Sequence, residues 1–286
     1  FEKAAQAGDD AFDVVLPDQQ NAMRYAGRGY LTELSTVPYL DFDRAYWLKN
    51  SVTELSIGGR SYFFVGDMNL SAYESVPVYF FNKSMAENYG IDDLYTTMRD
   101  GGWTFDRMLA YASLCSADLN GDGAFGKEDA YGIALNGFSV LTLTYSGGFR
   151  LVEKDENDFP KISIDQRWID YLQHAITECS QNPAVLNGDN IAGGNVLEGV
   201  NIRKTAFRED RVLFYQEMVT MATELRDMET DFGVLPVPKA SDTQDAYLSF
   251  FHPQGSAVAI PAANSALERT GMVLEDMGYY SRLGVR

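Results

Sequence analysis

The segment from Asp118 to Asp129 carries the residue types and spacing of a calcium-binding loop. Acidic or amide side chains stand at its first, third, fifth and twelfth positions, and Gly123 stands at the sixth. Such a loop turns alternate oxygen-bearing groups toward one ion, and its sixth residue has to accept a sharp turn. We therefore predict a structural Ca²⁺ site, with ligands drawn from Asp118, Asn120, Asp122, Ala124 and Asp129.

The same spacing has a second explanation, because Asp and Asn side chains also bond their own backbone in Asx turns that need no ion. Asp129 also stands where calcium loops usually carry a longer glutamate. The loop occurs once, and a short apolar run at 131–135 follows it in place of a second helix. We expect the loop to pin a junction inside a larger fold, and the function to lie elsewhere.

The composition limits the classes of protein that this chain can represent. Its 286 residues exceed one ordinary domain and suit two lobes. The formal net charge of −18 creates a surface that repels phosphate, so we expect no nucleic-acid partner. Cys115 and Cys179 are spaced like no metal or redox motif, which predicts buried free thiols, with a disulfide as the alternative.

Apolar runs alternate with amphipathic segments, which indicates an α/β fold that positions these residues. The expected strands are 12–16, 76–81, 131–135, 212–215 and 256–261. The expected helices are 18–26, 103–115, 168–179, 218–228 and 264–277, the last ending at Gly278. Between them, 55–65 is expected to form a hairpin around a Gly58–Gly59 turn.

Catalytic motifs are missing from the sequence. There is no nucleophile elbow, zinc-protease helix, P-loop or dinucleotide fingerprint, and no motif singles out the two carboxylates that a glycosidase requires. Aromatic residues instead recur beside polar turns. Sugars offer apolar faces ringed by hydroxyls, which such side chains suit. We therefore expect a binding protein that is not an enzyme.

Several segments, taken in their order, carry a family resemblance. They are Gly8–Val15, Gly29–Leu34, Val78–Lys83, Gly102–Asp106, Phe232–Lys239 and Gly255–Pro261. In this succession the chain resembles the extracellular solute-binding proteins of bacterial ABC importers, family 1, the sugar-binding type that includes maltose-binding proteins. The resemblance implies a two-lobe, type II periplasmic-binding-protein architecture with mixed sheets and a hinge. It places lobe 1 at 1–77 plus 254–286, and lobe 2, with the calcium-type loop at 118–129, at 78–253.

The resemblance also implies a function, namely binding of a carbohydrate or oligosaccharide for uptake by hinge closure of the lobes and recognition of the closed form by the importer permease. The implied ligand contacts are Pro17, Gln20, Asn21, Glu74, Ser75, Asn136, Phe138, Tyr215, Glu217 and Met218. Capping or packing is the alternative role at each of these positions. Pro17, Gln20 and Asn21 do not repeat the residues of maltose-binding proteins, so the ligand need not be maltose.

The family context carries further expectations. It implies a monomeric, extracellular, cell-surface lipoprotein of a Gram-positive bacterium. The family's signal segment, one strand–helix unit and its last helices are not in this sequence, so we expect a chain truncated at both ends. The alternative functions are a carbohydrate-active hydrolase and a calcium-dependent adhesion or scaffold module.

Overall fold

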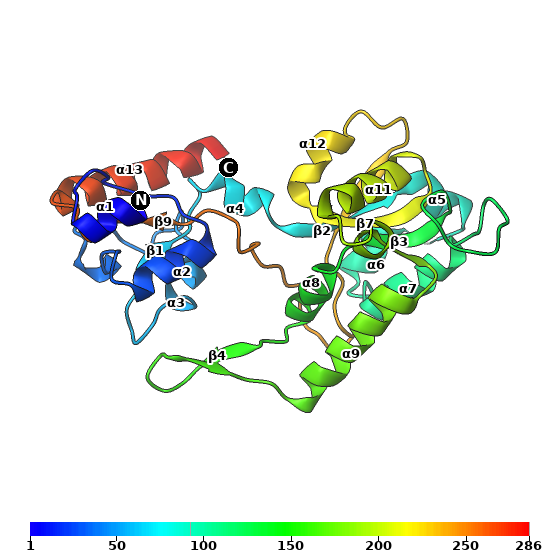
Figure 1. Cartoon of the computed structure of the whole chain (residues 1–286), viewed down its shortest axis with the longest axis horizontal. Helices are drawn as coiled ribbons and strands as arrows, with labels where there is room; N and C mark the ends of the chain where they lie inside the picture. Colours follow the sequence, from blue (N-terminus) through cyan, green and yellow to red (C-terminus); the bar gives the residue numbers. More distant parts are fainter. Residues whose placement is uncertain (92, 286) are drawn as a thin grey trace. The chain divides into compact units, whose positions relative to one another are not determined.

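The computed structural model describes residues 1–91 and 93–285, and the chain divides into two compact units (Figure 1). Unit 1 comprises Phe1–Ser75, Val152–Ile162 and Phe251–Arg286, and unit 2 comprises Val76–Leu151 and Ser163–Phe250. The two-lobe α/β class expected from the sequence is confirmed. The observed bounds differ from the expected lobe 2 at 78–253, because unit 2 begins at Val76 and ends at Phe250 and because the stretch 152–162 packs with unit 1.

Unit 2 is built on a mixed five-stranded sheet in the order β6-β3-β7-β2-β8. The strands β6, β3 and β7 run parallel, whereas β2 is antiparallel to both β7 and β8. Their bounds are β2 Pro77–Asn82, β3 Tyr131–Leu135, β6 Val185–Asn187, β7 Val212–Met218 and β8 Phe232–Pro236. Parallel strands need crossover helices, which supply the cover for both faces.

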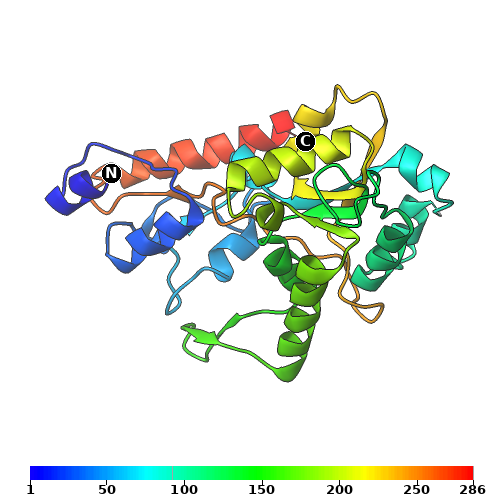
Figure 2. The ribbon, with the colours of Figure 1, turned by 45° about the vertical axis from the view of Figure 1, so that its right-hand side comes forward.

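Helices bury the two faces of this sheet (Figure 2). The side chains of β2 alternate, so that Tyr79 and Phe81 pack with α7 and α9 on one face and Phe80 packs with α11 on the other. Thr104 caps α7 through a hydrogen bond from the Arg107 amide, within the expected helix 103–115. The helices of unit 2 are α5 Lys83–Asn88, α6 Leu94–Arg99, α7 Phe105–Leu114, α8 Ser139–Ser146, α9 Gln166–Gln181, α10 Gly188–Ile191, α11 Val196–Arg208 and α12 Ala222–Leu225, with a 3₁₀ turn η2 at Val219–Met221.

Unit 1 holds a short antiparallel pair, β1 with β9, between helices. Its core gathers Trp47, Phe64, Val258, Ile260 and Leu274. The elements are α1 Glu2–Ala7, α2 Gln19–Gly27, η1 Leu34–Thr36, α3 Lys49–Thr53, β1 Phe63–Phe64, α4 Leu70–Glu74, β9 Val258–Ala259 and α13 Leu267–Val285. No helix in the described ranges is both long and apolar enough to cross a bilayer.

The structure corrects three expected elements. The run 12–16 is not a buried parallel strand, because it makes one antiparallel bridge at Val15, and Leu16 is 60% exposed. The expected helix 218–228 is shorter, since β7 extends to Met218 before η2 and α12 begin. The last helix does not end at Gly278 but runs on to Val285.

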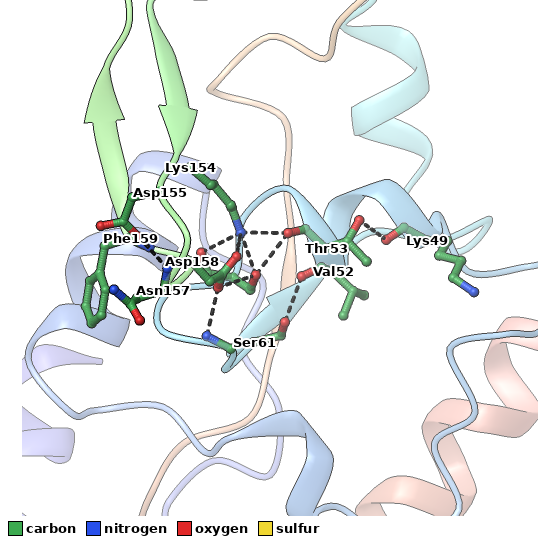
Figure 3. A network of polar contacts seen from close by, with 11 residues as sticks. Lys49, Val52, Thr53, Ser61, Lys154, Asp155, Asn157, Asp158 and Phe159 are labelled. Atoms are coloured by element: carbon green, nitrogen blue, oxygen red, sulfur yellow. Dashed lines mark hydrogen bonds and ion pairs between the residues drawn. The ribbon is translucent and has the colours of Figure 1, made fainter.

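The strands β4 Val152–Lys154 and β5 Pro160–Ile162 form a hairpin (Figure 3). The hairpin is flanked in sequence by segments of unit 2 but packs as part of unit 1. The Nζ of Lys154 donates to the carbonyl of Thr53 at 2.7 Å and to Asp158 Oδ1 at 2.6 Å. The other oxygen of Asp158 accepts from Ser56 Oγ at 2.7 Å and from the Gly59 amide at 2.8 Å. These bonds fix the hairpin to the predicted glycine turn.

Candidate ligand-binding site

The carboxyl ends of β6, β3 and β7 lie at one edge of the unit 2 sheet because these strands are parallel. The residues that end or follow them are polar: Asn187 ends β6, Asn136 follows β3, and Glu217 lies at the end of β7. Open α/β sheets bind ligands at this edge, where loops and helix starts converge. Asn136 and Glu217 are both predicted ligand contacts, and the sheet places them on neighbouring strand ends.

A hydrogen-bonded network connects these strand ends below the surface. The backbone amide of Asn136 donates to Ser139 Oγ at 3.2 Å. That hydroxyl donates to Gln216 Oε1 on β7 at 2.6 Å, and both Ser139 and Gln216 are buried. The network holds the turn after β3 to the end of β7, so the polar edge has a fixed shape.

Asp189 extends the polar edge toward β6. Its Oδ2 accepts from the Gly137 amide at 2.8 Å, which ties the β6–α10 turn to the β3–α8 turn. The side chain of Asn187 accepts from the amides of Asp189 and Asn190 and thereby caps α10. A half-exposed carboxylate is therefore held at the same edge as Glu217.

Arg203 on α11 reaches the end of β7 from inside the unit. Its Nη1 donates to the Gln216 carbonyl at 3.1 Å, and its Nη2 lies 3.2 Å from Glu217 Oε2. The other carboxylate oxygen of Glu217 accepts from the amide of Met218 at 3.1 Å. The Glu217 side chain is 16% exposed and that of Arg203 is 1% exposed, so of this ion pair only Glu217 reaches solvent.

Aromatic side chains lie beside the polar edge. Phe138 stands at the start of α8, and its ring centroid is 6.3 Å from that of Phe250. Tyr145, about two turns further along α8, is 5.6 Å from the same ring and is 38% exposed. Partly exposed rings next to carboxylate and amide oxygens offer both apolar faces and hydrogen-bond acceptors.

The remaining predicted contacts of unit 2 have different surroundings. Tyr215 is fully buried between the sheet and α11, with Arg203 5.6 Å from its ring centroid. Burial is the main cause that raises the pKa of Tyr215 well above its ordinary value. Met218 is half-buried and directly follows Glu217. Tyr215 thus supports the edge from within, and Met218 lies on it.

Two of the predicted contacts of unit 1, Pro17 and Ser75, bond to the segment 252–257. The carbonyl of Pro17 accepts from the Ala257 amide at 2.8 Å, and the carbonyl of Ser75 accepts from the His252 amide at 3.3 Å. Gln20 and Glu74 are exposed. Asn21 is engaged in the cap of α2, where Asp18 accepts from its backbone amide and from its side chain.

The calcium-type loop shows a backbone-bonded arrangement. Asp118 accepts from the amides of Gly121 and Gly123, and Asp129 accepts from those of Leu119 and Gly126. The bonds to Gly126 and other amides hold the pKa of Asp129 below its usual value. Among the described residues, no group of three or more His, Cys, Asp or Glu side chains is gathered as a metal site. Calcium binding stays a prediction.

Comparisons with solved structures establish the fold. The GacH receptor of Streptomyces glaucescens, solved with and without acarbose, matches with a TM-score of 0.62 and 18% identity over 97% of this chain and 63% of its own. Lmo0181, an ABC substrate-binding protein of Listeria monocytogenes solved with cycloalternan, matches at 0.60 and 17% over 96% and 63%. UspC of Mycobacterium tuberculosis matches at 0.65 and 16% over 98% and 66%.

The chain therefore has the fold of the solute-binding proteins of ABC importers, as the sequence resemblance implies. It spans somewhat less than two thirds of the length of these structures, 63% for GacH and for Lmo0181. No family model and no curated protein matches the sequence.

Sequence reasoning missed Asp189, Arg203 and Gln216 at this site. Asp189 lies in a stretch that reads as a Gly- and Asn-rich loop, and its position after an apolar pair was the available signal. Gln216 directly follows the expected strand 212–215, and continued period-2 alternation would place its side chain on the opposite face from Tyr215. Arg203 carries no local signal, because a buried arginine is identified only by its partner on another element.

Proposed function

We propose that this chain is the ligand-binding part of an extracellular solute-binding protein that captures a carbohydrate for an ABC importer. The observation that carries the proposal is the carboxyl edge of the unit 2 sheet, where the polar residues Asn136, Asp189 and Glu217 lie at the strand ends and Phe138 follows at the start of α8. Sugars need hydroxyl acceptors and an apolar stacking face together. The fold supports the proposal, since GacH was solved with acarbose and Lmo0181 with cycloalternan.

In this proposal the protein binds and releases its ligand unchanged. Ligand draws the two lobes together about a hinge, and the permease recognises the closed form. The protein acts as a monomer anchored at the cell surface as a lipoprotein. Binding energy comes from the stacking face and from hydroxyl hydrogen bonds, so it requires no covalent chemistry.

A thermal-shift panel on the 286-residue chain tests the proposal. The panel contains maltotriose, maltotetraose, cycloalternan, acarbose and tagatose, with glycerophosphocholine as a ligand that is not a sugar. At least one sugar should raise the melting temperature in a concentration-dependent way, because a ligand that binds only the folded state stabilises it by mass action. Carbohydrate binding is refuted if none of the sugars does so.

Two alanine variants locate the site once a sugar binds. Phe138→Ala removes the stacking ring and should weaken binding by about 1 kcal/mol or more, the usual worth of an aromatic contact. Phe125→Ala is the control, since Phe125 is also a phenylalanine open to solvent, 43% exposed, but lies in the calcium-type loop. Equal affinities for the two variants would move the site away from this edge.

We also propose that the loop 118–129 takes up Ca²⁺ as a structural ion. Its donors fit a hard cation, because Asp118, Asn120, Asp122 and Asp129 bring carboxylate and amide oxygens and Ala124 brings a carbonyl. The backbone hydrogen bonds to these side chains already hold the loop in a closed turn. The ion would pin the connection from α7 to β3 and would not contact the sugar.

A further inference from the structure

Arg203 is an interior cation in unit 2. Its side chain is 1% exposed, and it ranks among the largest fully buried side chains of the described residues. The backbone makes room for it at Gly188, where a Cβ would lie 2.9 Å from both Cδ and Nε of the arginine. A charged side chain is almost never fully buried unless it is paired, because removing it from water costs several kcal/mol.

The charge of Arg203 is directed at one carboxylate. Nη2 faces Glu217 Oε2 at 3.2 Å, Nη1 donates to the Gln216 carbonyl at 3.1 Å, and the guanidinium lies 5.6 Å from the ring centroid of Tyr215. The buried Nε has no hydrogen-bond partner. An incompletely satisfied interior cation makes the remaining bond to Glu217 costly to break, so this carboxylate cannot rotate away freely.

We propose that Arg203 is a positioning residue that holds the Glu217 carboxylate at the sheet edge as an oriented hydrogen-bond acceptor. Glu217 receives the guanidinium on one oxygen and the Met218 amide on the other, which fixes its plane while leaving it 16% exposed. The inference rests on the proposed function, because it assigns the ligand contact at this edge to Glu217. Arg203 itself does not reach the ligand.

The same arrangement defines the ligand class. Two partly exposed carboxylates, those of Glu217 and Asp189, lie at this edge, whereas the Arg203 guanidinium that pairs with Glu217 is buried. A neutral polyol can donate its hydroxyls to these acceptors. A sugar acid or sugar phosphate would place a second anion against them, and like charges at close range are unfavourable. The site therefore selects neutral, hydroxyl-rich ligands over anionic ones.

Calorimetry with maltotriose and its aldonic acid, maltotrionate, tests the ligand class on the 286-residue chain. Wild type should bind maltotriose at least about tenfold more tightly than maltotrionate, which corresponds to one charge-assisted contact. Glu217→Gln and Arg203→Met should each weaken maltotriose binding by about tenfold. The double variant should be no weaker than the weaker single variant, because both changes act on one contact. Tighter binding of maltotrionate, or additive losses in the double variant, would overturn the inference.

A urea-denaturation cycle decides the positioning role without any ligand. In wild type, Glu217→Gln should lower the denaturation midpoint, because it removes the counter-charge of a buried cation. In the Arg203→Met background the same change should leave the midpoint unchanged or raise it. The pair of Lys204 on α11 and Glu224, whose side chains are 27% and 55% exposed and whose charged atoms are 2.8 Å apart, is the control and should show little coupling.

The two failures are distinguishable. If wild type binds neither sugar, the maltodextrin form of the proposed function fails, and the urea cycle still decides whether Arg203 holds Glu217. If wild type binds maltotriose but a folded Arg203→Met variant binds it equally well, the proposed function stands and the positioning role is wrong. Arg203→Lys keeps the charge but not the forked geometry, so it should restore stability more than affinity.

Discussion

Gly278 lies against the indole of Trp47, where a Cβ on the glycine would be 2.6 Å from Cη2 of the ring. Gly66 approaches the same indole, and a Cβ there would be 2.3 Å from Cε3. The helix α13 continues through Gly278 to Val285, so this glycine permits close packing and does not end the helix. The core of unit 1 therefore requires a residue without a side chain at this point of α13.

Replacing Gly278 by alanine should destabilise the protein by about 1–3 kcal/mol, the usual cost of forcing an extra methyl group into a packed core. The sign of this change in stability is informative, because at an open helix position alanine is favoured over glycine by about 1 kcal/mol. Gly284→Ala on the same helix is the control, since a Cβ there meets nothing within 4 Å. Urea denaturation of both variants measures the difference, and a stabilised Gly278→Ala variant would show that the contact with Trp47 is loose.

Local patterns predicted unit 2 well, for a physical reason. Strands such as 131–135 are buried on both faces and read as apolar runs, and Thr104 caps α7 with its own side chain. The errors arose where tertiary packing overrides a local signal. Gly278 looks like a helix stop unless the position of Trp47 is known, and 12–16 is apolar enough for a strand but lies at the surface of unit 1.

The candidate site also contains residues that the sequence indicated and residues that it did not. The family resemblance implied Asn136 and Glu217 as ligand contacts, and the structure places both at the carboxyl ends of the neighbouring parallel strands β3 and β7. Arg203 could not be predicted, because its role depends on a pairing across 14 residues between a helix and a strand. The resemblance also implied Tyr215 as a contact, and strand alternation turns its ring into the core behind the edge.

The hairpin contact of Lys154 with Asp158 should stabilise unit 1 in a pH-dependent way. The hydrogen bonds from Lys154, Gly59 and Ser56 lower the pKa of Asp158 to about 2. A carboxyl group whose pKa is lowered in the folded state stabilises the fold. The contribution is complete when the pH is above the ordinary pKa of the group, and it is lost as the pH falls toward 2. Thermal melts between pH 2 and pH 6 should show a larger loss in wild type than in Asp158→Asn.

Lys154→Met should lower the melting temperature at pH 7, because it leaves the Thr53 carbonyl and the Asp158 carboxylate without this donor. Lys161→Met, on the other strand of the hairpin and exposed, is the matched control and should change the melting temperature little. Equal melting temperatures for the two variants would show that the clamp in Figure 3 adds nothing to stability.

Calcium should raise the melting temperature of wild type, since an ion bound only by the folded state stabilises it by about 2.7 kcal/mol at a hundred times its dissociation constant. Asp118→Ala should abolish the response and also lower stability in EDTA, because Asp118 accepts from the Gly121 and Gly123 amides. Asp118→Asn keeps one acceptor oxygen and separates the two effects. An equal melting temperature of wild type in calcium and in EDTA would favour the Asx-turn explanation. A changed sugar specificity in Asp118→Ala would instead place the loop at the ligand site.

The thiols of Cys115 and Cys179 should be inert in the folded protein. Both are buried and free, and burial raises their pKa to about 11 and about 12. Because the thiolate is the reactive form, only about a thousandth or less of each thiol is reactive at pH 8, and reagents must also reach it. A disulfide-exchange dye should therefore report no thiol in native protein and both thiols in guanidinium, whereas Cys115→Ala should report one. Finding no thiol even in guanidinium, until a reductant is added, would mean that the two cysteines pair, as an exported protein allows.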